Sequence, residues 1–179
     1  MLEYFEKFGI PTCDTDKLAR DVISPGSEGQ LELAKAIGDD YFRHGILNRA
    51  KLRRTLFQEH QLKSTVESII HPRVKEAVEK WRLKPVHAPY QILASPLLLE
   101  TNQHFDLDGI IVVDVTPKIQ VERASKRDGE KPGAIKQIIQ TQMSREERLS
   151  YANFIIENSG SVQALEHQVK LLHRQITND

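Results

Sequence analysis

The sequence predicts an α/β fold with a mostly parallel sheet. Short apolar segments at residues 90–94, 109–115 and 154–156 have the composition of strands, and helical patterns lie between them. The β-branched run at 109–115 is nearly continuous, which is typical of a parallel strand buried on both faces. Strands that alternate with helices indicate a parallel sheet with helices packed on it.

Capping and turn signals define the first elements. Residues 3–8 are expected to end a helix at Gly9, because glycine adopts the left-handed conformation of a helix cap without strain. A short extended segment at 10–13 then ends at Asp14, and one or two helical turns follow over 18–23.

The middle of the chain, residues 30–84, is expected to be mostly helical, with a polar interruption at 39–45. Proline is tolerated in the first turn of a helix, so Pro72 is predicted to begin a new one. A Thr-Pro start predicts a helix at 116–127, and apolar residues at helical spacing predict another at 135–143. A final helix is predicted at 162–176.

Composition excludes several classes of function. The 179 residues include 25 basic and 25 acidic side chains, so no broad nucleic-acid-binding surface is expected. No apolar run approaches the roughly 20 residues that span a bilayer, and acidic residues near the start exclude a secretory signal. The single cysteine, Cys13, excludes an internal disulfide and a multi-cysteine zinc site. We therefore expect a cytoplasmic protein with no membrane or nucleic-acid partner.

Asp14 and Asp16 form the first candidate site, because they directly follow a predicted strand. In open α/β sheets, ligands bind beyond the carboxyl ends of the strands. Two carboxylates there could hold a magnesium ion through water, or accept a proton from an attacking hydroxyl. Arg20 lies four residues after Asp16, so a helix would bring the two together. The alternative is an N-cap aspartate with a surface ion pair.

A set of arginines forms the second candidate site. Gln120, Arg123 and Arg127 fall on one helix face, and Arg145 and Arg148 are expected on the following helix. Two helices joined by a loop can move as a flap, and guanidinium groups on such a flap suit phosphate oxygens. The alternative is a solvated basic face paired with neighbouring glutamates.

His71, which precedes Pro72, is a third candidate, with a capping or packing role as the alternative. The other histidines show no metal-ligand spacing. Cys13 is expected to be a small buried hydrophobic residue rather than a nucleophile.

Taken together in chain order, these segments resemble the dephospho-coenzyme A (dephospho-CoA) kinase family over essentially the whole chain. The resemblance rests on Asp14-x-Asp16-x-x-Ala19-Arg20, Leu47-x-Arg49-x-x-Leu52, Ile70-His71-Pro72, Pro96-Leu97-Leu98-Leu99-Glu100, Val112-x-x-Val115-Thr116-Pro117, Gln120-x-x-Arg123-x-x-x-Arg127-Asp128, Gln142-x-x-Arg145-x-x-Arg148 and Ile156-x-Asn158-x-Gly160. Each motif alone is weak, whereas their order and spacing together are specific.

The resemblance implies a P-loop kinase-like, three-layer fold and an ATP-dependent reaction. Such enzymes transfer the γ-phosphoryl group of ATP, with Mg²⁺, to the ribose 3′-hydroxyl of dephospho-CoA. Residues 1–29 and 86–179 would form the kinase core, including a helical lid at about 120–150. Residues 30–85 would form an acceptor-binding cap.

The resemblance also implies roles on the acceptor side. Asp16 would accept the proton of the hydroxyl, and Asp14 would support it or a magnesium-bound water. Arg20, Arg49 and His71 would line the acceptor site. Which of the two aspartates is the base stays open.

On the nucleotide side, the resemblance implies that Arg123 and Arg127 begin the lid and that Arg145 closes on the phosphates. Asn158, after the last strand, would lie near the adenine of ATP. No pattern indicates which residues would bind the metal or what the oligomeric state is.

The chain departs from the family at its start. The family begins with a strand and the glycine-rich loop G-x-x-x-x-G-K-[ST], and no such motif occurs in these 179 residues. The missing strand would be the central one of the sheet, and the loop would supply the amides and the lysine that hold the phosphates. We therefore expect little or no kinase activity from these residues alone.

Three explanations for the missing loop stay open, of which we favour the first. The sequence could be incomplete at its start, it could be a truncated form without activity, or it could keep a nucleotide- or CoA-binding role without catalysis. A related small-molecule kinase that acts on another hydroxyl is a further alternative.

Overall fold

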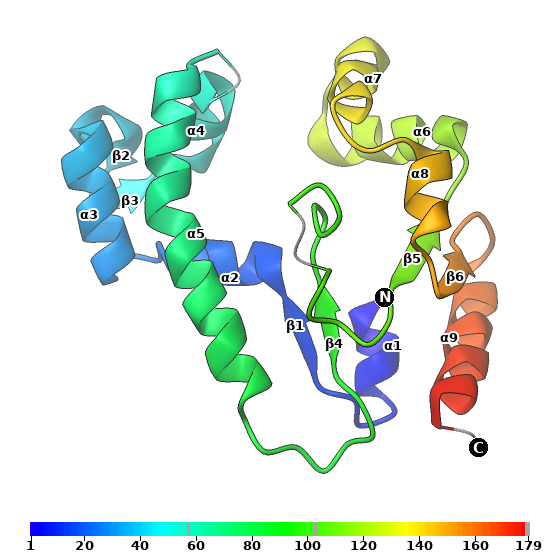
Figure 1. The fold of residues 1–179 in the computed structure, drawn as a ribbon. Helices are drawn as coiled ribbons and strands as arrows, with labels where there is room; N and C mark the ends of the chain where they lie inside the picture. Colours follow the sequence, from blue (N-terminus) through cyan, green and yellow to red (C-terminus); the bar gives the residue numbers. More distant parts are fainter. Residues whose placement is uncertain (57, 102–103, 178–179) are drawn as a thin grey trace. The chain divides into compact units, whose positions relative to one another are not determined.

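The computed structural model describes residues 1–56, 58–101 and 104–177, which fall into two compact units (Figure 1). The β1–β4 unit comprises Thr12–His87 and Ile92–Pro96. The β5–β6 unit comprises Met1–Pro11, Ala88–Gln91 and Leu97–Asp179. Each unit contains one pair of parallel strands, and helices connect the two strands of each pair.

In the β1–β4 unit, two strands enclose a long helical segment in the sequence. Parallel strands require a crossover connection, and the helices between β1 and β4 supply it. Thr12, Cys13 and Asp14 pair in register with Ile92, Leu93 and Ala94. The elements are β1 (Thr12–Asp14), α2 (Thr15–Asp21), α3 (Glu28–Ile37), η1 (Asp39–Tyr41), β2 (Phe42–Arg43), β3 (Ile46–Leu47), α4 (Arg49–Leu56), α5 (His60–Arg82) and β4 (Ile92–Ala94).

The apolar core of this unit lies among its helices. Helix α5 contacts α2, α3 and α4, so the shorter helices pack against one long one (Figure 1). Burial of apolar side chains on these facing surfaces supplies the main favourable free energy of folding. The buried cluster consists of Ile23, Leu33, Leu47, Leu52, Val66 and Ile69.

Pro72 lies inside α5, so the prediction that it begins a helix is wrong. A proline within a helix leaves the carbonyl four residues earlier, here that of Ser68, without its N–H donor. Ser68 and Pro72 are both exposed, so water can solvate this carbonyl. Val66 and Ile69 are buried in the core before the proline, and Arg73 pairs with Glu32 of α3 directly after it, so tertiary contacts on both sides favour one continuous helix.

The antiparallel pair of β2 and β3 was missed by the expectation of a mostly helical segment. Its turn consists of His44 and Gly45, whose φ values are 51° and 73°. Two positive φ values are typical of a type I′ hairpin turn, which usually carries Asn or Asp before Gly. Strands of two residues each are also too short to show an alternating pattern.

The β5–β6 unit has a second parallel pair. Ile111, Val112, Val113 and Asp114 pair in register with Phe154, Ile155, Ile156 and Glu157. Helix α9 packs on β6 and on α1, and α6 packs on α7. The elements are α1 (Leu2–Glu6), β5 (Ile111–Asp114), α6 (Pro117–Asp128), α7 (Pro132–Gln140), α8 (Arg145–Ser150), β6 (Phe154–Glu157) and α9 (Val162–Thr177).

The structure confirms the predicted α/β class with parallel strands, and it confirms strands near all three predicted segments. It also confirms the turn at Gly9, whose φ is 72°. The expected burial of β5 on both faces is wrong, because Val113 is 42% exposed. Among the described residues β5 pairs with β6 alone, so one edge of β5 also has no strand partner within this sheet.

The expected helix at 135–143 ends at Gln140, and Arg145 begins a separate short helix, α8. Ser144 caps α8 by accepting a hydrogen bond from the Glu147 amide at 3.1 Å. A serine at this position competes with helix continuation, because its side chain satisfies the amides of the next helix start. Across the described ranges, no helix is both long enough and apolar enough to cross a membrane.

Candidate functional site

The carboxylates predicted after the first strand lie at the junction of β1 and α2. Asp14 is the N-cap of α2, and its Oδ1 accepts hydrogen bonds from the amides of Asp16 at 2.8 Å and Lys17 at 3.2 Å. Asp14 therefore has one oxygen committed to the backbone. The side chain of Asp16, in the first turn of α2, is exposed. The two carboxylates thus differ: one orders the helix start, and the other faces solvent.

The predicted acceptor residues Arg20 and Arg49 meet in the β1–β4 unit. An Nη atom of Arg49, at the start of α4, donates to the backbone carbonyl of Arg20 at 3.0 Å. Arg20 lies in the same helix as Asp16, as expected, while the ion pair on that helix joins Lys17 to Asp21 at 3.2 Å. The contact with Arg49 therefore links α4 to the helix that carries Asp16.

His71 lies in α5, where its side chain is exposed. Its neighbour Ile70 packs against the apolar core of the β1–β4 unit. Because α2 and α4 both contact α5, the helices that carry the predicted acceptor residues form one packed group.

The residues predicted for the nucleotide lie in the β5–β6 unit, around the carboxyl ends of its strands. Asn158 directly follows β6, and its amide donates to the carbonyl of Asp114 at 2.8 Å. An Nη atom of Arg123, in α6, donates to the carbonyl of Asn158 at 2.6 Å. These bonds join the ends of β5 and β6 and bring Arg123 to this edge of the sheet.

Arg145 is held at the same edge by the carboxylate of Asp114, the last residue of β5. Its Nε donates to Oδ1 at 2.8 Å and one Nη donates to Oδ2 at 2.5 Å. The Asp114 side chain is 11% exposed and that of Arg145 is 38% exposed. The hydrogen bond to Asp114 and its negative charge raise the pKa of Arg145 above its usual value. Three predicted nucleotide residues, Arg123, Arg145 and Asn158, therefore converge around Asp114.

Further hydrogen bonds fix the backbone that carries Arg145. The Met143 amide donates to Oε1 of Glu100 at 3.2 Å, and Arg148 donates to the Met143 carbonyl at 2.6 Å. Ser144 follows as the N-cap of α8. The backbone of Met143, two residues before Arg145, is thus restrained at both its amide and its carbonyl.

Arg127 lies four residues further along α6 than Arg123, a rise of about 6 Å along the helix away from β5. Its guanidinium binds the carboxylate of Asp128, with Nε to Oδ1 at 2.8 Å and Nη to Oδ2 at 2.9 Å. The structure therefore places Arg127 in a pair on the helix end, whereas Arg123 and Arg145 reach the strand ends.

Asp114 is the residue that sequence reasoning missed. It lies within the clearest predicted strand and ends the observed β5, and the rule that ligands bind beyond the carboxyl ends of strands applies to it as well as to Asp14. Its charge within an otherwise apolar, β-branched run was the available signal. The arginine that pairs with it could not be identified, because the two residues are far apart in sequence.

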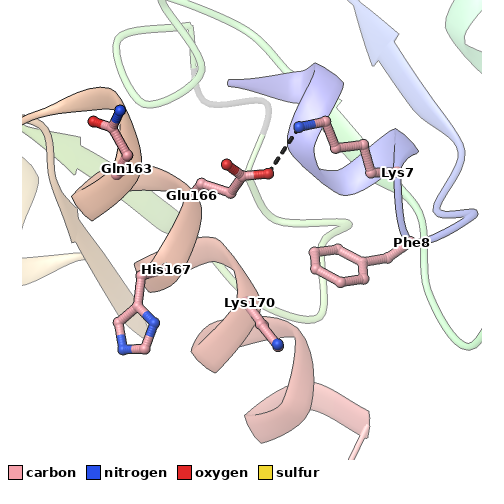
Figure 2. Close-up of a pocket in the computed structure, with 6 residues that line it drawn as sticks. All are labelled: Lys7, Phe8, Gln163, Glu166, His167 and Lys170. Atoms are coloured by element: carbon pink, nitrogen blue, oxygen red, sulfur yellow. Dashed lines mark hydrogen bonds and ion pairs between the residues drawn. The ribbon is translucent and has the colours of Figure 1, made fainter.

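Two shallow pockets lie away from these residues. One has a volume of about 330 Å³, in the β1–β4 unit, and is lined by Gln30, Leu31, Ala34, Asp39, Phe42, His44 and Gly45. The other has a volume of about 420 Å³, in the β5–β6 unit, and is lined by Lys7, Phe8, Gln163, Glu166, His167 and Lys170. Figure 2 shows Lys7 paired with Glu166 there, at 2.7 Å. Neither pocket contains a predicted site residue.

Among residues 1–56, 58–101 and 104–177, no three or more His, Cys, Asp or Glu side chains are grouped so as to hold a metal ion. Cys13, expected as a buried hydrophobic residue, is confirmed as buried, and its burial raises the pKa of the thiol.

Comparison with known proteins gives a consistent result. The family model described as dephospho-CoA kinase matches residues 1–164. The dephospho-CoA kinase of Acinetobacter baylyi is 39% identical over 177 residues, covering 98% of this chain and 90% of that protein. That of Hydrogenovibrio crunogenus is 37% identical over 174 residues, covering 96% of this chain and 88% of that protein.

Solved structures agree with this fold. The crystal structure of TT1252 from Thermus thermophilus matches with a TM-score of 0.77 and 25% identity, covering 97% of this chain and 88% of that one. The dephospho-CoA kinase from Campylobacter jejuni, at 21% identity and a TM-score of 0.67, supports the fold alone, over 99% of this chain and 90% of that one. With a family match over most of its length and relatives above 35% identity, the chain belongs to the dephospho-CoA kinase family.

Proposed function

We propose that this chain provides the acceptor-binding and phosphate-binding residues for ATP-dependent phosphorylation of the ribose 3′-hydroxyl of dephospho-CoA. The observation that carries the proposal is the match to dephospho-CoA kinases over nearly the whole chain. A kinase core of residues 1–29 and 86–179, a lid at about 120–150 and a cap of residues 30–85 belong to the same proposal, as does action in the cytoplasm. The carboxylates at β1 and the arginines at β5 and β6 suit such a reaction chemically.

On the acceptor side, we assign the proton-accepting role to Asp16. Its carboxylate is exposed and free of the helix cap, whereas Oδ1 of Asp14 already accepts two backbone amides. A general base must reach the hydroxyl whose proton it takes, and an exposed carboxylate at a strand end can do so. Arg20, Arg49 and His71 would bind the acceptor, since cationic and donor groups suit its phosphate oxygens.

On the nucleotide side, Arg123 and Arg145 would stabilise the negative charge of the transferred phosphoryl group. Arg127 would contribute after leaving Asp128, and Asn158 would lie near the adenine. Positioned guanidinium groups lower the barrier to phosphoryl transfer chiefly through electrostatic stabilisation.

Asp14, directly or through water, would hold Mg²⁺, which would supply positive charge against the phosphates of ATP. This ion usually keeps several waters and takes only one or two protein carboxylates besides phosphate. The donor set of the chain fits that pattern, because Asp14 has an uncommitted Oδ2, while no larger carboxylate cluster is present among the described residues.

Binding of dephospho-CoA to the purified chain, measured by isothermal titration calorimetry, tests the acceptor side. Arg49→Ala and His71→Ala should each weaken binding by about tenfold, as expected for loss of one hydrogen bond to a charged group. Arg43→Ala is the matched control, because Arg43 is an exposed arginine of β2 in the same unit. If all three variants bind dephospho-CoA with the affinity of the unsubstituted chain, Arg49 and His71 do not belong to the acceptor site.

The absence of a G-x-x-x-x-G-K-[ST] motif favours a second candidate, a nucleotide- or CoA-binding protein without catalysis. Chromatographic separation of coenzyme A from dephospho-CoA after incubation with ATP and Mg²⁺ tests turnover directly. Turnover by these 179 residues would exclude the non-catalytic candidate, whereas binding of dephospho-CoA without turnover is the result that both candidates expect from a chain without the loop. Absence of both binding and turnover contradicts both candidates.

A further inference from the structure

We propose that Asp114 is a positioning residue, which holds the guanidinium of Arg145 by one edge so that another edge is free to take phosphate oxygens. The inference rests on the proposed function for the identity of the phosphate ligand. It assigns to Asp114 a role that the family match does not supply.

The geometry of the pair determines which donors stay free. Asp114 engages Nε and one Nη of Arg145, with its two oxygens at 2.8 and 2.5 Å. A guanidinium has five N–H donors in a planar fork, so the edge formed by the two Nη atoms keeps a pair of parallel donors. Such an edge matches two oxygens of a phosphate. No other acceptor for Arg145 is found in the described ranges.

Burial supports a fixed orientation. The carboxylate of Asp114 is 11% exposed, while the Arg145 side chain remains 38% exposed. The inner edge of the guanidinium therefore binds a nearly buried anion, and the rest of the group remains accessible. A nearly buried carboxylate is costly to leave unpaired, so it restrains Arg145 strongly.

The backbone of Asp114 is itself held in place. The Asp114 carbonyl accepts the amide of Asn158 at 2.8 Å, and the Asn158 carbonyl accepts an Nη of Arg123 at 2.6 Å. A chain of hydrogen bonds through Asn158 and Asp114 thus connects Arg123 with Arg145. A guanidinium that is already oriented loses less conformational entropy when it binds a ligand.

Two substitutions separate positioning from charge neutralisation. Asp114→Asn keeps the size of the side chain but turns an amide N–H₂ group toward an arginine donor, which breaks the two-bond pair. Asp114→Glu keeps the charge but adds a methylene, which displaces the guanidinium. The control is Glu166→Gln, which removes the ion pair between α9 and Lys7 in the same unit, outside the proposed site.

The first measurement is the ¹H–¹⁵N spectrum of arginine Nε–H groups in the 179-residue chain. Arg145→Lys identifies the Arg145 signal by its loss. In the unsubstituted chain we expect this proton to exchange slowly with water. In Asp114→Asn its exchange should be about tenfold faster, because one charge-assisted hydrogen bond is lost. In Glu166→Gln the exchange rate should not change. An Arg145 signal with equal exchange in Asp114→Asn would show that the pair does not hold the guanidinium in solution.

The second measurement is the affinity for sodium tripolyphosphate, which carries the phosphate oxygens of ATP without adenosine. Titration should shift the Arg145 signal, and Kd should rise by about tenfold or more in both Asp114 variants. Unchanged or tighter binding in Asp114→Glu would overturn the positioning role, since charge alone would then suffice. If only Asp114→Glu folds, this second comparison still decides the proposal.

The outcomes also separate this inference from the proposed function. Phosphate binding at an Arg145 held by Asp114, without any binding of dephospho-CoA, would contradict the proposed function and leave the positioning role intact. Binding of dephospho-CoA, together with an Arg145 signal that does not shift on addition of tripolyphosphate, would contradict the positioning role and leave the proposed function intact.

Discussion

The N-cap at Asp14 allows the two carboxylates after β1 to be separated experimentally. Asp14→Ala removes the side-chain oxygen that accepts the amides of Asp16 and Lys17. Loss of an N-cap aspartate typically costs about 1 kcal/mol, within a range of roughly 0.5–2. Asn caps helices about as well as Asp, so Asp14→Asn should keep nearly all of that stability.

The assay for this prediction is urea unfolding followed by the fluorescence of Trp81. Trp81 is the only tryptophan and lies in the β1–β4 unit together with Asp14, so the signal reports on the relevant unit. With a denaturant slope of about 2 kcal/mol per molar urea, a loss of about 1 kcal/mol lowers the midpoint by about 0.5 M. An equal decrease in Asp14→Asn and Asp14→Ala, or none in Asp14→Ala, would refute the capping argument.

Three further predictions follow from other features. Gly29→Ala should lower the urea midpoint of unfolding, because a Cβ there would collide with the Val22 carbonyl. Gly133→Ala in α7 meets open space and should raise the free energy of unfolding by about 0.5–1 kcal/mol. Equal effects of the two substitutions in urea unfolding would contradict this prediction. Because burial raises the pKa of Cys13, its iodoacetamide labelling should begin at higher pH in the native than in the unfolded chain. Stability should fall as pH rises above about 8.5, and a native labelling midpoint at or below that of the unfolded chain would disagree. ATP-dependent formation of coenzyme A by the 179-residue chain should be negligible, and rapid turnover in the chromatographic assay would show that the glycine-rich loop is dispensable.

Local signals predicted the strands and several helix starts, because they depend on neighbouring residues. The run before Asp114 is a strand, and Thr116 caps α6 with Pro117 as its first residue. Pro72 was misplaced, because tertiary packing of α5 outweighed the local preference of proline. The hairpin turn at His44 lacked the usual asparagine or aspartate, so sequence gave little signal for it.

The candidate site was predicted in its residue types but not in its contacts. Arg123 and Arg145 were identified from helical spacing and motif order, whereas their partners, the Asn158 carbonyl and the Asp114 carboxylate, are distant in sequence. Such pairs depend on how α6 and α8 fold back onto the strand ends. The grouping of Asp16 with Arg145 around one phosphate stays a prediction, because the two residues belong to different units.

The two-stranded sheet of β5 and β6 has a consequence for handling the protein. Each strand has a single strand partner in the described ranges, and Val113 and Ile155 are 42% and 56% exposed. Unpaired backbone groups beside apolar side chains can recruit strands from other molecules. Concentrated solutions should therefore form β-rich aggregates, and Val113→Lys should delay the rise in light scattering, because a charged side chain disfavours stacking of one sheet edge on another.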